Sequence, residues 1–302
     1  MKNDTAGDPM SSKKWSRKST RCISAQVREK NIQICANTIA GILKDLNYSL
    51  KSNRKNIAKT QHPDRNQQFE IIAQMKDRFT RLNYPYISVD CKKKEQVGNF
   101  KNTGQTWCIE PESVYTHDFR SYAKGMANPY GIYEPLLNNG TVVVGTSHDT
   151  PEFSVESIVL WLNQFGFNNY SDLSHLLILC DCGGSNGYRA RAWKYGIFKK
   201  ICQPFKIRVT VCHYPSGASK WNPVEHRLFS FISMNWAGVP LRNYDTILRY
   251  ISSTTTKQGL KVNAILNDKS YEKGIKITDK QMKEINIERY HTLPLWNYTI
   301  FD

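Results

Sequence analysis

The stretch HLLILCD, residues 175–181, constrains the fold more than any other part of the chain. Its unbroken apolar run has the length of a strand and predicts a strand that is fully buried. Another strand is predicted at 141–149 (TVVVGTSHD), and an amphipathic helix at 154–166 lies between the two. Strand, helix and strand in this order favour a right-handed crossover and parallel pairing. The sequence therefore predicts an α/β domain.

Acidic residues follow the predicted strands at the places where an open α/β sheet gathers its ligands. Asp90 ends the strand PYISVD (85–90), and Asp181 ends HLLILCD. A third acidic residue, Glu225, lies near the start of an amphipathic helix in WNPVEHRLFSFI. Three carboxylates that meet would repel one another unless a cation held them together, and oxygen ligands of this kind suit Mg²⁺ or Mn²⁺. We therefore expect a two-metal site that transfers phosphoryl groups on nucleic acid.

Glu225 also has a purely structural interpretation. Asn222 is a good N-cap and Pro223 suits the first helical position, so that Glu225, third after the cap, fits a capping box. The helix alone does not decide between a cap and a metal ligand. The order along the chain does, because an Asp after the first strand, an Asp after the fourth and a Glu after the fifth (206–215) is the layout of a ribonuclease-H-like nucleotidyl transferase core.

The charge of the chain indicates a polyanionic partner. Its 302 residues contain 42 Lys and Arg against 26 Asp and Glu, a net charge of +16, and residues 1–60 alone carry +9 (13 against 4). Nucleic acid is the commonest partner of such an excess, and a merely solvated basic face is the alternative. We expect phosphate contacts from these basic residues: Lys51, Arg54, Lys55, Lys92, Lys93, Lys94, Lys220 and Arg227.

Residues 19–60 are predicted to form a helix-turn-helix domain that binds DNA. Ser19 would cap its first helix, and a recognition helix is expected near residues 36–46. The alternative is an ordinary packed helix pair. The remaining segments are predicted as a flexible basic arm (1–18), a linking helix (61–84), a catalytic domain (85–240) and a C-terminal α/β appendage (241–302).

Several shorter segments give weaker signals. QTWCI (105–109) is predicted as a strand that returns from the first one, and 110–138 as a loop. The pairs His117-Asp118 and His148-Asp149 fit either a base with its orienting group or ordinary hydrogen-bonded turns. The turn CGGSNG after Asp181 lacks the Lys and the spacing of a phosphate-binding P-loop, so its glycines indicate a sharp exit from the sheet.

The cysteines and the N-terminus bear on the compartment. The eight cysteines show no paired CxxC spacing and predict buried free thiols in a reducing environment. The polar N-terminus has no signal-peptide core, and no apolar run reaches the length of a membrane span. We therefore expect a cytoplasmic, prokaryotic protein associated with the nucleoid.

Beyond these patterns, the chain resembles a DDE transposase of the ISAzo-type insertion-sequence family. The matching strings run in order from about Gly7 to the end of the chain and include KKWSRKSTR, NTIAGILKDLNYSL, QHPDRNQQF, ISVDCKKKEQVGNFKN, THDF, NPYGIY, HDTPEFSVESI, CDCGGSNGYR, HYPSGASKWNPVEHRLFSFISMNW and WNYTI. The resemblance implies a ribonuclease-H-like mixed sheet flanked by helices. It also implies cutting at transposon ends with two Mg²⁺ or Mn²⁺ ions and joining of the freed 3′ ends to target DNA. Carried over by position, the catalytic and metal-binding triad is Asp90, Asp181 and Glu225.

The resemblance also implies partners. They are double-stranded DNA, as transposon ends and as target, and further copies of the chain that assemble on that DNA. The chain departs from the family in starting at what would be its second helix-turn-helix, which implies an N-terminally shortened copy. Cys91 replaces an expected Thr, and Pro223-Val224 varies the usual helix start. Two rival functions are a ribonuclease-H-like nuclease without strand transfer and a non-catalytic, DNA-binding relic of a transposase.

Overall fold

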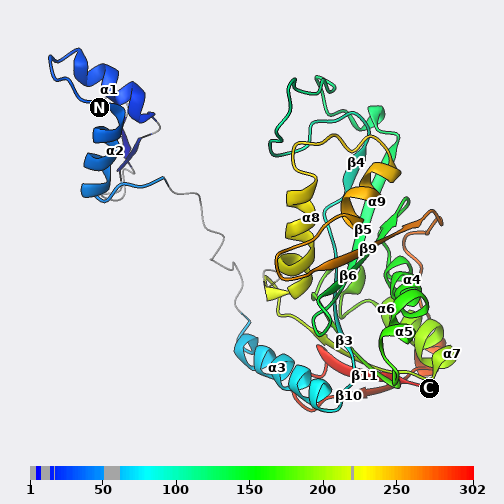
Figure 1. Cartoon of the computed structure of the whole chain (residues 1–302). Coiled ribbons are helices and arrows are strands. Elements are labelled where there is room, and N and C mark those ends of the chain that lie inside the picture. Colours follow the sequence, from blue (N-terminus) through cyan, green and yellow to red (C-terminus); the bar gives the residue numbers. More distant parts are fainter. Residues whose placement is uncertain (1–4, 8–13, 17, 51–61, 219–220) are drawn as a thin grey trace. The chain divides into compact units, whose positions relative to one another are not determined.

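The computed structural model describes residues 5–7, 14–16, 18–50, 62–218 and 221–302. The chain divides into two compact units, Met1–Ile57 and Ala58–Asp302 (Figure 1). This boundary falls within the predicted helix-turn-helix segment (19–60), three residues before its end. The predicted phosphate contacts Lys51, Arg54, Lys55 and Lys220 lie outside the described residues.

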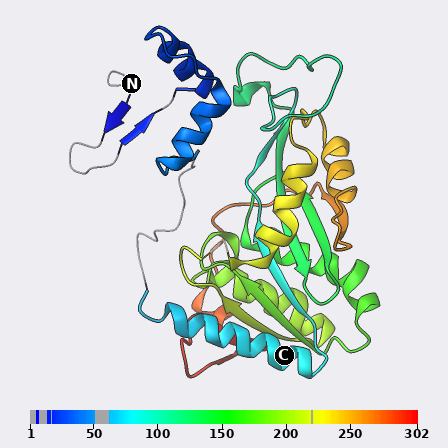
Figure 2. The same ribbon diagram turned by 60° about the vertical axis from the view of Figure 1, so that its left-hand side comes forward.

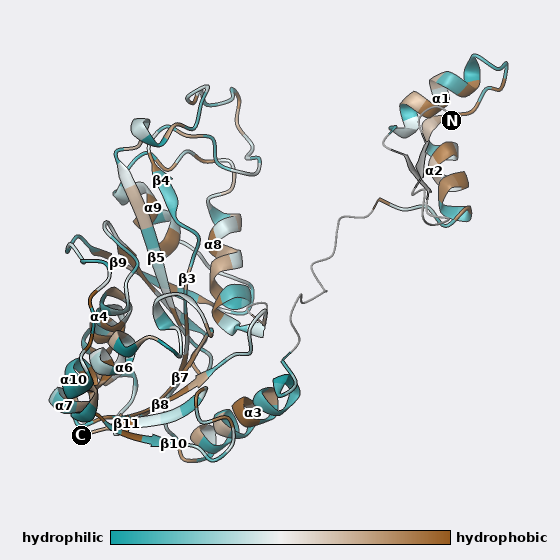
Figure 3. Ribbon diagram, turned by 180° about the vertical axis from the view of Figure 1, so that it is seen from behind, coloured by the Kyte–Doolittle hydropathy of each residue, from teal (hydrophilic) through white to brown (hydrophobic). Residues whose placement is uncertain are grey.

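The first unit contains the two helices that the sequence predicts. The helix α1 spans Thr20–Arg28, and the Ser19 side chain caps it by accepting from the Cys22 amide at 3.2 Å. The helix α2 spans Ala36–Asp45 and is coloured mostly brown in Figure 3, but of its residues only Ile39 is buried. The apolar side chains of this segment are therefore only partly covered, since Ile42 and Leu46 are exposed.

The expectation of a flexible arm at residues 1–18 is wrong for six of them. Strands β1 (Thr5–Gly7) and β2 (Lys14–Ser16) pair as an antiparallel hairpin. Two three-residue strands are too short for hydrophobic periodicity to signal them, which is why the sequence did not indicate this pairing.

The described strands of the second unit form one nine-stranded mixed sheet in the order β10-β11-β8-β7-β3-β5-β6-β9, with β4 paired to β5. The central strands are β3 (Tyr86–Cys91), parallel to β7 (His175–Cys180), which is parallel to β8 (Arg208–His213). The C-terminal strands lie at both edges of this sheet: β9 (Lys261–Asn267) next to β6 (Asn139–Gly145), and β11 (Asn297–Phe301) with β10 (Asn286–Arg289) next to β8. The C-terminal segment thus completes the main sheet instead of covering it.

The prediction for residues 105–138 was wrong. QTWCI forms no strand, and Trp107 and Ile109 in it are fully exposed. The strand that returns antiparallel to β3 is β5 (Gly125–Glu134), inside the predicted loop, and it also pairs with the short β4 (Glu95–Val97). Its sequence GMANPYGIYE contains the glycines, Asn and Pro that usually mark loops. The composition therefore predicts a loop, and the strand forms through its pairing with β3, β4 and β6.

Helices cover both faces of the sheet. On one face lies α4 (Pro151–Trp161), extended by a π-helical turn (Leu162–Gly166) and α5 (Phe167–Asn169). It packs with α6 (Arg191–Ile197), which continues through a second π-helical turn (Phe198–Cys202) into α7 (Gln203–Phe205). On the other face lie α8 (Ser230–Asn235) and α9 (Tyr244–Ser252), so that α8 and α4 flank the sheet from opposite sides (Figure 1).

Within the segment predicted as a linking helix (61–84), the structure has the helix α3, Arg65–Arg81 (Figure 2). Its buried residues Ile72, Met75 and Phe79 pack against Tyr86, Leu177 and Leu179 of β3 and β7. Leu82, the residue directly after α3, is 53% exposed. Because side chains alternate along a strand, the residues that face α3 are the even-numbered ones of β3 and the odd-numbered ones of β7.

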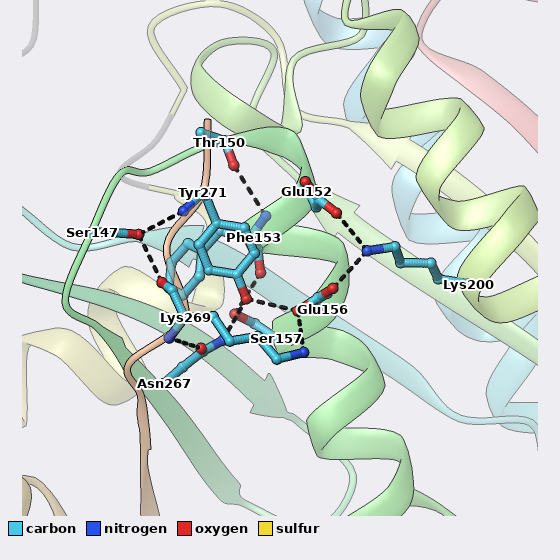
Figure 4. Close-up of polar contacts among 10 residues, drawn as sticks. All are labelled: Ser147, Thr150, Glu152, Phe153, Glu156, Ser157, Lys200, Asn267, Lys269 and Tyr271. Atoms are coloured by element: carbon cyan, nitrogen blue, oxygen red, sulfur yellow. Dashed lines mark hydrogen bonds and ion pairs between the residues drawn. The ribbon is translucent and has the colours of Figure 1, made fainter. Parts of the chain in front are cut away.

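The segment after β9 is tied to α4 by the polar contacts that Figure 4 shows. Asn267 donates to the Tyr271 hydroxyl at 2.7 Å, and that hydroxyl donates to Glu156 at 2.7 Å. Lys200 and Lys269 pair with the same carboxylate at 2.6 and 3.1 Å. Further along, α10 (Asp279–Lys283) begins with the predicted capping box of Thr278 and Gln281.

All eight cysteines lie in the described ranges and are free, as expected. Three of them, Cys22, Cys35 and Cys108, are exposed instead of buried. Among the helices that the structure describes, none has both the length and the apolar composition needed to span a membrane.

Candidate active site

Strand register brings two of the three predicted acidic residues together. In the parallel pair β3–β7, Ser88 lies opposite Leu179. Asp90 and Asp181 each follow two residues later, so they lie at the same level, and by the alternation of side chains they project from the same face of the sheet. Neighbouring strands are about 4.8 Å apart. The two carboxylates therefore meet at the carboxyl ends of the central strands.

The third acidic residue comes from the helix on that face. This helix starts at Pro223, passes through a π-helical turn (Glu225–Phe229) and continues as α8. Gly131 of β5 lies opposite Asp90 and lets the helix approach, because a Cβ there would lie 2.5 Å from the Phe229 ring. The Glu225 side chain lies near enough to Asp90 to contribute to the rise of the Asp90 pKa.

The predicted capping box at the start of this helix is not formed. The main-chain oxygen of Asn222 accepts from the Glu225 amide at 3.1 Å, as an N-cap should, but the Asn222 side chain turns away from its own helix. It donates to Val89 O and to Asp181 Oδ1, each at 3.3 Å, and accepts from the Ser88 hydroxyl. The Ser88 oxygen in turn accepts from the Val224 amide at 3.1 Å. Residues from three separated segments are thus joined by direct contacts.

Electrostatics at the three carboxylates is unfavourable. Burial raises the pKa of Asp90 to about 8, and the charges of Asp181 and Glu225 add to the rise, while the Cys91 amide, which donates to Asp90 Oδ1 at 2.8 Å, opposes it. Burial raises the pKa of Asp181 to about 6, against the hydrogen bond from Asn222. No Lys or Arg of the described chain is a main contributor to either pKa. The group holds more negative charge than the protein neutralises.

The three groups fit hard divalent cations, because all of them offer carboxyl oxygens and their negative charges repel one another when no cation is bound. Within the ranges that the structure describes, no three His, Cys, Asp or Glu side chains already converge closely enough to hold a metal ion.

Four of the predicted basic residues lie in the described ranges, and one of them makes close contacts within the protein whereas the other three are exposed. Lys92 pairs with Glu95 at 2.6 Å, lies 4.7 Å from the centre of the Trp236 ring, and has a side chain that is only 11% exposed. Lys93, Lys94 and Arg227 are exposed. Lys93 and Glu225 line one hollow of about 510 Å³. Of these four residues, Lys93 is therefore the one best placed for a phosphate beside the acidic group.

A second hollow, of about 590 Å³, opens beside Asp181 and is lined by the glycine turn Gly183–Gly187 together with Arg189. Gly184 has φ +67, so this turn needs a glycine. Arg189 is exposed and lies over the Tyr188 ring. The prediction did not single it out. Its position directly after a glycine-rich turn that follows an acidic residue was the available signal.

His213 was also missed. It ends β8, is fully buried, and its Nδ1 lies 2.9 Å from the main-chain oxygen of Asp181. Because a carbonyl only accepts, Nδ1 carries the hydrogen, and Nε2 accepts from the Tyr298 hydroxyl at 3.0 Å. Burial lowers the pKa of His213 to about 4, so it stays neutral and supports the backbone at Asp181.

Both predicted His-Asp pairs lie in loops. His117 stacks on Phe119 in the loop before β5. Asp149 accepts from the Cys91 thiol at 3.2 Å, which links the end of β6 to the residue after Asp90. His148 is exposed.

Comparison with known proteins gives a family for the whole chain. The profile of the family described as "Rhodopirellula transposase DDE domain" matches residues 1–302. No curated protein matches the sequence. Among solved structures, the chain is similar to the Mos1 transposase paired-end complex with left transposon end, with 12% identity over 81% of this chain and 73% of that chain and a TM-score of 0.46.

Two further Mos1 structures are similar to the same degree. The Mos1 paired end complex with Mg shows 11% identity over 81% of this chain and 73% of that chain, with a TM-score of 0.43. The Mos1 Strand Transfer Complex shows 9% identity over 77% of this chain and 64% of that chain, with a TM-score of 0.44. The family profile, which spans the entire sequence, carries the assignment: this chain belongs to the DDE transposases of that family and is a DNA transposase.

Proposed function

We propose that this transposase cleaves DNA at the ends of its element and joins the freed 3′ ends to target DNA at the site of Asp90, Asp181 and Glu225. The observation that carries the proposal is the shared level of Asp90 and Asp181 on adjacent strands, with Glu225 brought onto the same face. The register of β3 and β7 supports a shared site for these three residues at the carboxyl ends of the central strands.

In this proposal the three carboxylates hold two Mg²⁺ or Mn²⁺ ions. When bound, such ions lower the pKa of an attacking water or 3′-hydroxyl and neutralise charge on the leaving oxygen. The residues would contribute the ligands: Asp90, whose pKa is raised to about 8 without a cation, would lose its proton when an ion binds, and Asp181 and Glu225 would supply the other carboxyl oxygens. His213 and the Cys91 amide hold the backbone and the carboxylate in place.

DNA contacts are proposed on both sides of the acidic group. Lys93 and Lys94 would hold the phosphate backbone on the Glu225 side and Arg189 on the Asp181 side. The helix pair α1–α2 would bind transposon ends, with α2 as recognition helix. Because two ends must be brought together, further copies of the chain would assemble on the DNA.

The test is Asp181→Asn in an assay of Mg²⁺-dependent nicking on DNA that carries the ends of the native element. We expect a loss of at least about 10³-fold in nicking, with DNA affinity changed less than about twofold, because only metal ligation is removed. Asp172→Asn, an exposed aspartate in the turn before β7, is the matched control. Nicking by Asp181→Asn at the wild-type rate would refute the assignment.

Joining separates a transposase from a nuclease. With pre-cut ends and a target plasmid, we expect wild-type protein to insert the ends, and Asp181→Asn to insert none. Cutting without insertion would favour a nuclease at this site.

A further inference from the structure

The side chain of Asn222 makes three hydrogen bonds beside the acidic group, and none of them caps its own helix. Its side chain is fully buried, and all of its contacts go to other segments: to β3 at Ser88 and Val89, and to Asp181 after β7. We propose that Asn222 is the positioning residue of the divalent-ion site, where its amide fixes the Asp181 carboxylate relative to Asp90 and Glu225. This inference rests on the function proposed above.

The direction of each hydrogen bond in this network is forced. The Val224 amide can only donate, so the Ser88 oxygen accepts from it and uses its own hydrogen toward Asn222. The Asn222 oxygen therefore faces Ser88, and the NH₂ group faces the two acceptors, Val89 O and Asp181 Oδ1. A flipped amide would not satisfy these partners, since it would set its oxygen against Val89 O and Asp181 Oδ1, and its NH₂ group against the Ser88 hydroxyl hydrogen.

Ser88 makes this use of Asn222 possible. An Asn before a helix normally accepts from an amide of its own first turn. Here the hydroxyl of Ser88, on the neighbouring strand, accepts from the Val224 amide instead. The Asn222 side chain is thereby released from capping and spans the gap between the strands and the helix.

The contacts of Asn222 reach the positions of all three acidic residues. Val89 O belongs to the residue before Asp90, Asp181 Oδ1 is an acidic oxygen itself, and the Asn222 main chain accepts from the Glu225 amide. One residue thus links all three acidic positions, two of them through its side chain and Glu225 through its main chain.

A neutral amide suits this task better than a charged group. A Lys or Arg at this place would form an ion pair with Asp181 and neutralise the charge that a divalent ion needs. An amide N–H orients the carboxylate and leaves its charge in place. Partners of this kind typically change metal affinity by about 10- to 100-fold when they are removed.

The test compares Asn222→Leu with Asn267→Leu. Asn267 is also buried and also has contacts through both ends of its amide, to the Tyr271 hydroxyl and the Lys269 amide, but none to the acidic group (Figure 4). Both variants should lower the melting temperature of the metal-free protein. Only Asn222→Leu should weaken Mn²⁺ binding, measured by electron paramagnetic resonance without DNA, by about tenfold or more.

Nicking gives a second readout. The Mg²⁺ concentration for half-maximal nicking should rise by about the same factor for Asn222→Leu, with much of the rate recovered at saturating Mg²⁺, and stay unchanged for Asn267→Leu. A merely structural role for Asn222 would lower stability without moving this midpoint. If Asn222→Leu does not fold, Asn222→Ser, which is too short to reach Asp181, is measured in its place.

Asp181→Asn in the same Mn²⁺ titration distinguishes a wrong ion site from a wrong role for Asn222. If it binds Mn²⁺ as tightly as wild type, the ion site itself is misassigned. If it loses binding while the Asn222 variants bind like Asn267→Leu, the site stands and the positioning role of Asn222 is refuted.

Discussion

Glu156 and Asp90 are both partly buried carboxylates of the second unit, yet their surroundings act on them in opposite directions. Burial alone would raise the pKa of Glu156, but hydrogen bonds from Lys200, Tyr271 and Lys269 lower it to about 2. Asp90 has only acidic neighbours among its main charged contributors, and its pKa rises to about 8. A carboxylate that the protein neutralises stabilises the fold, whereas one left without a cation destabilises the fold and is available to a ligand.

The largest effect is expected from Asp90→Asn in metal-free protein, which should raise the free energy of unfolding by on the order of 3 kcal/mol at pH 8. A difference of one pKa unit corresponds to about 1.4 kcal/mol, and relaxation of the structure reduces the total. The Asp90 pKa is higher in the folded than in the unfolded chain. The unfolded chain therefore holds fewer protons between about pH 4 and pH 8, and wild-type stability falls as pH rises through this window. Urea unfolding in EDTA at pH 5 and pH 8 measures the difference.

Mg²⁺ should change the stability of wild type and of Asp90→Asn by different amounts. Its addition should stabilise wild type and not Asp90→Asn, because binding requires the ionised carboxylate. Equal stability of the two metal-free proteins at pH 8 would contradict the charge imbalance at the site.

A smaller effect is expected from Gly131→Ala. The new methyl group would lie 2.5 Å from the Phe229 ring and 2.9 Å from a Val224 methyl, so the helix that carries Glu225 must shift. We expect a loss of about 2 kcal/mol in stability and a loss of nicking well beyond it. Gly183→Ala, where a Cβ meets nothing within 4 Å, is the control for the loss of stability. Wild-type nicking by Gly131→Ala would show that the close approach is not needed.

Much of this could be predicted from the sequence, because the strands around Asp90 and Asp181 are apolar runs with clear ends and because Glu225 begins an amphipathic helix. The strand β5 could not, since Pro129 and Gly131 resemble loop residues and the need for Gly131 arises from Phe229 and Val224, far away in sequence. The direction of the Asn222 side chain depends on Ser88 for the same reason. Local patterns identify the acidic residues, and only tertiary contacts show what holds them.

Glu156→Gln should act in the opposite direction from Asp90→Asn, with a loss of about 1 kcal/mol at pH 7 after discounting for its partial exposure. Since the Glu156 pKa is lower in the folded chain, this stability is present above about pH 4.5 and disappears as pH falls toward 2. Thermal unfolding of both proteins at pH 7 and pH 3 measures it. A difference that grows on acidification would contradict the contacts in Figure 4 as its source.

The smallest effect is expected from Lys93→Ala, which should weaken DNA binding about threefold and reduce the slope of log affinity against log salt by about one. Lys257→Ala, another exposed lysine, should leave both unchanged. Binding titrations at several salt concentrations test this. An unchanged slope for Lys93→Ala would remove Lys93 from the DNA path.

The central claim is that Asp90, Asp181 and Glu225 share divalent ions. Anomalous diffraction from crystals of the transposase grown with DNA ends and soaked in Mn²⁺ tests it most directly. We predict manganese peaks bounded by oxygen atoms of all three side chains. Manganese bound elsewhere, with Glu225 directed away from Asp90 and Asp181, would contradict it.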